Sequence, residues 1–123
     1  MTDPEQMREI VASGRYAAVA LCMDDEPYVV TMNHGWDASG EVLYFHCALE
    51  GRKMDYIAAN GRACATVVDD RGYKEGECDH VYRSVVMRGR IEVVRDLEEK
   101  KHGLQVLLDH LSLIHISEPT RPY

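Results

Sequence analysis

The sequence predicts a mainly β domain in which short antiparallel strands form a small closed or split β-barrel with two or three peripheral helices. Runs rich in β-branched, aliphatic and aromatic residues alternate with short turns of Asp, Pro and Gly, as expected for an antiparallel sheet. Apolar residues at helical spacing are confined to a few segments. A chain of 123 residues, 46% hydrophobic and 28% charged, suits a single hydrophobic core.

Each expected element has its own local signal. The first helix begins where Asp3 precedes Pro4 and ends at Gly14, a short second helix lies between Gly51 and Gly61, and a third helix is capped by Asp96. The expected buried helix faces are Met7, Ile10 and Val11, then Met54, Ile57 and Ala58, and last Leu97, Leu104, Leu107 and Leu108. The first four expected strands are 16–23, 28–34, 42–46 and 62–68. A polar loop is expected at 69–80. Residues 81–94 are expected to form either one long strand or two strand segments separated by a bulge at Gly89.

Segment 43–62, LYFHCALEGRKMDYIAANGR, joins an expected strand to the second helix through Gly51. The start of a helix presents backbone N–H groups and the positive end of the helix dipole, which suits a phosphate. Arg52 adds a planar guanidinium and Lys53 a point charge for the same anion. The segment therefore predicts a phosphate site; the alternative is a solvated basic pair on a surface helix.

Four motifs follow one another along the chain: PYVVTMN at 27–33, the turn DASG at 37–40, the segment 43–62, and YRSVVMRGR at 82–90. In these motifs the sequence resembles the FMN-binding split-barrel superfamily, the pyridoxamine 5'-phosphate oxidase-like proteins. It is similar in particular to the Nim-type nitroimidazole reductases. The resemblance covers the chain from about residue 10 to about residue 110.

This resemblance implies positions for a flavin. The isoalloxazine would lie against strand 30–34 and the phosphate at the turn before the second helix. Gly51 stands where some members have a serine, which removes one hydroxyl contact. Trp36 would either cover the ring or fill the barrel rim. The implied cofactor-binding residues are Met32, Asn33, His34, His46, Cys47, Gly51, Arg52 and Lys53, with His46 preferred over His34 as the catalytic residue.

The resemblance implies an FMN-dependent oxidoreductase that reduces a small nitroaromatic or similar substrate. The alternative is a non-catalytic protein that binds flavin or haem on the same barrel. A homodimer with the flavin at its interface is expected, with the strand containing Val85 and Val86 as the contact surface. No metal site is expected, since Cys78 and His80 alone fall short of the four ligands of a structural zinc.

Charge and hydropathy restrict the partners and the location. A net charge of −7 argues against a nucleic-acid partner, because phosphate backbones need a basic face. No apolar run approaches the ~20 residues that cross a bilayer. The acidic start MTDPEQMREI lacks a signal pattern, so a cytoplasmic protein is expected.

The last segment has a different character from the rest. LSLIHISEPTR at 111–121 carries no motif of the family and is not expected to continue the preceding helix. It matches the translation of DNA resembling a transposase-type sequencing adapter. We therefore expect a flavin-binding domain at 1–110 that lacks its C-terminal strands, followed by a non-native tail at 111–123.

Overall fold

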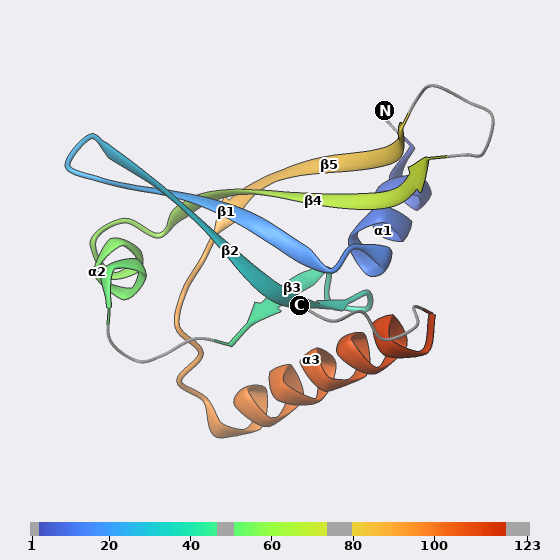
Figure 1. Cartoon of the computed structure of the whole chain (residues 1–123). Helices are drawn as coiled ribbons and strands as arrows, with labels where there is room; N and C mark the ends of the chain where they lie inside the picture. Colours follow the sequence, from blue (N-terminus) through green and yellow to red (C-terminus); the bar gives the residue numbers. More distant parts are fainter. Residues whose placement is uncertain (1–2, 47–50, 74–79, 118–123) are drawn as a thin grey trace.

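The computed structural model describes residues 3–46, 51–73 and 80–117. Five antiparallel strands form one twisted sheet in the order β3-β2-β1-β4-β5, which curls into an open half-barrel (Figure 1). This is the split-barrel class that the sequence predicts. The strands are β1 (Tyr16–Met23), β2 (Glu26–Asp37), β3 (Val42–Phe45), β4 (Arg62–Tyr73) and β5 (His80–Arg90).

The three helices are α1 (Pro4–Ser13), α2 (Arg52–Ala59) and α3 (Leu97–Ser117). Helix α1 begins as predicted, because the Asp3 side chain accepts a hydrogen bond from the Glu5 N–H at 3.0 Å and Pro4 occupies the first turn. The Asp96 carboxylate caps α3 in the same way, accepting from the Glu99 N–H at 2.9 Å. Among the described residues, no helix is long and apolar enough to span a membrane.

The β1–β2 hairpin forms the centre of the sheet. Strand β1 has the predicted bounds, and Met23 pairs with Glu26 across a two-residue turn. Asp24 and Asp25 both adopt left-handed backbone conformations, with φ of 51° and 64°. Such turns match the twist of the flanking strands. Strand β2 is longer than the predicted 28–34 at both ends.

The β4–β5 hairpin corrects two predictions. Residues 69–73, expected in a polar loop, continue β4, because their backbone pairs with β5 whatever their side chains prefer. The bulge expected at Gly89 is absent from the described register, where Ala63 pairs with Gly89; the irregularity lies between Asp70 and Gly72. Strand β5 ends at Arg90, so the expected strand 81–94 is too long.

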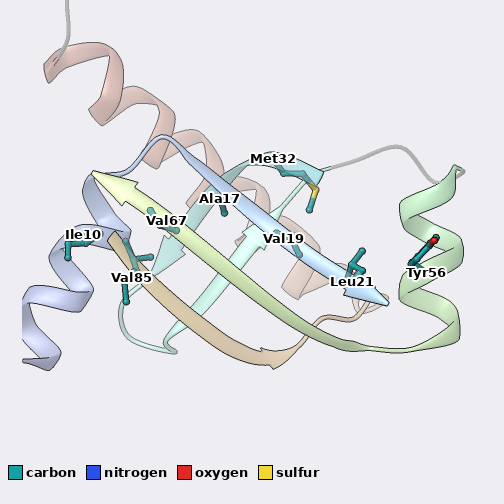
Figure 2. Close-up of a cluster of buried hydrophobic side chains, with 9 residues drawn as sticks. Ile10, Ala17, Val19, Leu21, Met32, Tyr56, Val67 and Val85 are labelled. Carbon is teal, nitrogen blue, oxygen red and sulfur yellow. The ribbon is translucent and has the colours of Figure 1, made fainter. Parts of the chain in front are cut away.

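The core fills the concave side of the sheet. Ala17, Val19 and Leu21 alternate along β1 and are buried, as the period of a strand requires. Figure 2 shows Val67 and Val85 next to α1, which carries Ile10, and Tyr56 of α2 at the opposite end of the cluster, near Leu21. The two short helices therefore close the two ends of one cluster.

Helix α3 packs across β2 and β3, and two glycines allow its close approach. A Cβ at Gly103 would lie 2.8 Å from the Tyr44 ring, and one at Gly35 would lie 2.9 Å from the backbone of Leu107. Its buried face consists of Gly103, Leu107 and His110, which are spaced i, i+4, i+7. The predicted face is wrong for Leu97, Leu104 and Leu108, which are 63%, 48% and 59% exposed. The backbone of α3 also continues to Ser117, so the expectation that the helix stops before residue 111 is wrong.

Candidate functional site

The turn at which the sequence predicts a phosphate site lies at the start of α2. Gly51 is the N-cap residue, with φ of 129° and ψ of 177°, and a Cβ there would meet open space. Only glycine adopts this backbone conformation readily, so the turn requires Gly51 for its conformation and not for packing. Arg52 is exposed and Lys53 is half-buried. Within the described part of the chain, neither side chain has a carboxylate partner.

The packed face of α2 agrees with the predicted one except at Ala58, which is exposed. Met54 and Ile57 are half-buried as expected, and Ile57 packs against the core beside the buried Tyr56. Tyr56, which the sequence analysis missed, is 8% exposed, and its ring lies 5.0 Å from that of Tyr28 between centroids. This aromatic contact holds α2 on the β1–β2 hairpin and so fixes the position of the turn that carries Lys53. The signal that could have revealed Tyr56 is its spacing, because an aromatic residue three positions after Lys53 lies on the same face of the helix.

Helix α2 ends where predicted, just before Gly61. Asn60 is the C-cap residue, with an extended backbone at φ −153° and ψ 110°. The Asn60 side-chain oxygen accepts a hydrogen bond from the Arg62 N–H at 3.1 Å. Gly61 is needed instead for close approach, because its added Cβ would lie 3.1 Å from the Ile91 carbonyl oxygen.

The predicted flavin strand presents its residues on two faces. Met32 and His34 point into the protein, at 7% and 0% exposure, whereas Asn33 between them is exposed. His34 pairs with Phe45 of β3, so His46 follows at the position beside Asn33, and it too is exposed. The structure thus brings Asn33 and His46 together at the surface and separates them from Met32 and His34.

His34 belongs to a buried histidine pair. Its Nε2–H donates to the Val11 carbonyl oxygen at 2.8 Å, and the Nε2–H of His110 donates to the Gly14 carbonyl oxygen at 2.8 Å. The two imidazole centroids are 4.5 Å apart. The pKa of His34 is lowered to about 4: burial is the largest cause, the hydrogen bond to Val11 opposes it, and the neighbouring His110 also lowers it. The pair therefore joins β2 and α3 to the C-terminal end of α1.

A second polar cluster lies at the β2–β3 turn. His102 of α3 contacts the Asp37 carboxylate at 2.7 Å, and the Ser39 hydroxyl donates to the other carboxylate oxygen at 2.8 Å. These hydrogen bonds hold the pKa of Asp37 at about 2. Trp36, beside this cluster in the sequence, packs half-buried against the core.

The remaining site predictions fall partly outside the described residues. Cys47 and Cys78 lie there, and the side chain of His80 is likewise not described. Cys22 and Cys64 are free thiols, both half-buried. Across the described ranges, no three His, Cys, Asp or Glu side chains are grouped to hold a metal ion.

An open antiparallel half-barrel, with a glycine-led basic turn after its third strand, defines a flavin-binding split barrel. A family model described as pyridoxamine 5'-phosphate oxidase matches residues 3–122, and the chain belongs to this family. The family binds flavins.

The chain is also similar to several solved structures and to one curated protein. A candidate 5-nitroimidazole antibiotic resistance protein from Bacteroides thetaiotaomicron is 26% identical, with a TM-score of 0.74, and the alignment covers 100% of this chain and 71% of that one. The flavocytochrome Anf3 from Azotobacter vinelandii is 25% identical, with a TM-score of 0.72 and coverage of 100% and 57%. The FAD and haem binding protein from Mycobacterium smegmatis has the same fold, with a TM-score of 0.73. It is 22% identical, and the alignment covers 100% of this chain and 60% of that one. An uncharacterized protein of Rhizobium meliloti (strain 1021) is 28% identical over 88 residues, which are 72% of this chain and 52% of that protein. The chain thus spans about half the length of that curated relative.

Proposed function

We propose that the protein binds FMN and acts as an oxidoreductase on a small nitroaromatic or similar electrophile. The observation that supports this most directly is the turn at Gly51, Arg52 and Lys53, where two cations without described carboxylate partners meet a helix start. The 26% identity to a candidate nitroimidazole resistance protein supports the substrate class.

The residues of the turn fit a phosphate. Gly51 leaves open space above the backbone, because its added Cβ would have no neighbour within 4 Å. Lys53 is half-buried and Arg52 is exposed, so a partly covered ammonium and a solvent-exposed guanidinium are both available at the turn. In this proposal Lys53 and Arg52 hold the FMN phosphate from opposite sides.

Asn33 and His46 would contact the rest of the cofactor. Both are exposed and adjoin at the β2–β3 edge, where an amide and an imidazole can donate or accept hydrogen bonds. FMN, when bound, supplies the electron-transfer chemistry, and the protein positions it. His46 would deliver a proton to the reduced substrate. His34 and Met32 act indirectly, because their buried side chains fix the strand from behind.

We further propose that the protein is a homodimer with the flavin at the interface. The convex face of the sheet carries exposed apolar side chains, including Val29, Val68 and Val86 at 64%, 44% and 59% exposure. Val85, expected in the contact surface, is 6% exposed and belongs to the core instead. A second copy on this face would cover the apolar residues beside the cofactor.

A binding protein without turnover is the second candidate. Two structural relatives are named for haem as well as flavin, and the exposed His46 imidazole could hold a haem iron. The visible spectrum of the purified protein distinguishes a flavin from a haem. Anaerobic mixing of the photoreduced FMN-loaded protein with a nitroimidazole then tests turnover, without the need to know the electron donor. Rapid reoxidation of the protein supports the enzyme, and a protein that stays reduced refutes it.

The FMN site is tested by the double variant Arg52→Ala/Lys53→Ala. It removes two charge-assisted contacts worth ~1.5–3 kcal/mol each, so FMN affinity should fall more than about a hundredfold. The matched control is Lys100→Ala/Lys101→Ala, which removes two exposed cations from α3. Fluorescence titration with FMN gives both dissociation constants. Equal affinity in the two variants would exclude this turn as the phosphate site.

A further inference from the structure

A second basic feature lies where β1, β4 and β5 meet the C-terminal end of α2. An open hollow of about 560 Å³ occupies this part of the surface, and none of the residues that line it carries a carboxylate. The lining residues are Ala20, Leu21, Cys22, Asn60, Arg62, Ala63, Cys64, Arg88, Gly89 and Arg90. Three arginines thus gather in one hollow of a protein whose net charge is −7.

Strand register places the three guanidinium groups on one face. Arg62 of β4 pairs directly with Arg90 of β5, and Cys64, two residues along, pairs with Arg88. Side chains two residues apart share a face of a sheet, so Arg62, Arg88 and Arg90 all project from the same side. Like charges directly opposite each other across two strands destabilise the pair.

No described carboxylate relieves this repulsion. Arg62, Arg88 and Arg90 make no ion pair with any described residue, in contrast to Arg8 and Arg83, which bind Glu41 and Asp69. The three side chains are exposed in the single chain, on the part of this face that lies beyond Val68 and Val86 of the proposed dimer surface, so their guanidinium groups are free to turn toward a common ligand. A phosphate group matches the planar fork of arginine and neutralises more than one of them.

We propose that this hollow binds a phosphate-bearing small molecule through Arg62, Arg88 and Arg90. The site is separate from the turn at Arg52 and Lys53. These residues lie at the other end of α2, whose eight residues span ~12 Å. The two sites can therefore be tested independently, and the proposal does not depend on FMN binding.

Calorimetric titration of the full chain with inorganic pyrophosphate, in the presence of saturating FMN, tests the site. Arg88→Gln/Arg90→Gln should weaken pyrophosphate binding at least about tenfold. The control Arg95→Gln/Lys100→Gln removes the same charge at exposed positions outside the hollow and should change it less than about twofold. Absence of pyrophosphate binding to the wild type, or equal binding by the two variants, would overturn the proposal.

The thiols in the hollow give a second measurement on the unaltered protein. Cys22 and Cys64 line the hollow, so pyrophosphate should slow their alkylation by iodoacetamide, resolved peptide by peptide in a mass spectrometer. Peptides with Cys47 and Cys78 serve as internal references. Alkylation of Cys22 and Cys64 at an unchanged rate under saturating pyrophosphate would contradict the site.

Two sources of the phosphate group are distinguished by competition. If the hollow holds a free nucleotide, ADP displaces pyrophosphate from the FMN-loaded wild type. If it holds inorganic phosphate, orthophosphate displaces pyrophosphate and ADP does not. Either result supports a phosphate site. A pyrophosphate signal with which neither ADP nor orthophosphate competes restricts the site to an adventitious ion only and overturns the proposal.

Discussion

Acidification should destabilise the protein through His34. In the folded state the Nε2–H of His34 donates to Val11, and its Nδ1 is buried with no hydrogen-bond partner among the described residues. Protonation would place a second N–H and a charge at that atom, beside His110. The folded-state pKa is accordingly lowered from 6.5 to about 4.

The magnitude follows from linkage. Because the folded pKa lies below the unfolded one, the unfolded state binds more protons between the two values, and stability falls as the pH falls through that window. A difference of about 2.5 in pKa corresponds to roughly 3 kcal/mol in full, of which ~2 kcal/mol is lost between about pH 7.5 and pH 5. Asp37, with a pKa of about 2, titrates below this range.

Urea unfolding of the wild type and of His34→Gln at the two pH values measures this effect. The glutamine amide can still donate to Val11 but does not titrate, so the variant should lose ~2 kcal/mol less than the wild type on acidification. His46→Gln is the control, since it removes an exposed imidazole and should keep the wild-type dependence. Equal pH dependence in the wild type and His34→Gln would refute the reasoning.

Two further predictions concern packing and assembly. Gly35→Ala should lower the free energy of unfolding, measured in urea, by ~1–3 kcal/mol, because the added Cβ would lie 2.9 Å from the α3 backbone. The control Gly89→Ala should leave the free energy of unfolding unchanged, because its Cβ meets nothing within 4 Å. Equal losses of stability in the two variants would contradict the close contact at Gly35. Val86→Glu should convert the proposed dimer to a monomer in light scattering, because it places a charge in an apolar interface. The control Leu104→Glu, on α3, should leave the dimer intact. A wild-type protein that is monomeric when loaded with flavin would exclude the dimer.

The strand bounds were predicted correctly where buried and exposed residues alternate along the strand, as in β1. In β1, Ala17, Val19 and Leu21 repeat with the period of a half-buried strand, and two aspartates mark its turn, so both bounds could be predicted. The extension of β4 through 69–73 could not, because it depends on pairing with a partner strand and not on local preference.

The helix faces show a similar limit. On α3 the sequence offers four leucines, but close packing against Tyr44 selects Gly103 for the interface and leaves Leu104 outside. A residue chosen for its lack of a side chain cannot be recognised from hydrophobicity. At the candidate site, the turn at Gly51 was predictable from glycine and charge, whereas the anchor Tyr56 and the burial of His34 depend on tertiary contacts.

The carbonyl of Gly14 accepts its hydrogen bond from His110, 96 residues later in the chain. During synthesis the first helix emerges long before its partner, so the buried end of α1 has no hydrogen-bonding histidine until α3 has left the ribosome. The carbonyl of Val11 likewise waits for His34, which follows it by 23 residues. The sheet can thus begin to pair early, but α1 docks fully only after nearly the whole domain has been translated. Early segments of the nascent chain therefore expose the apolar face formed by Ile10 and Val11 for most of the elongation time, and this face is where a chaperone would bind it.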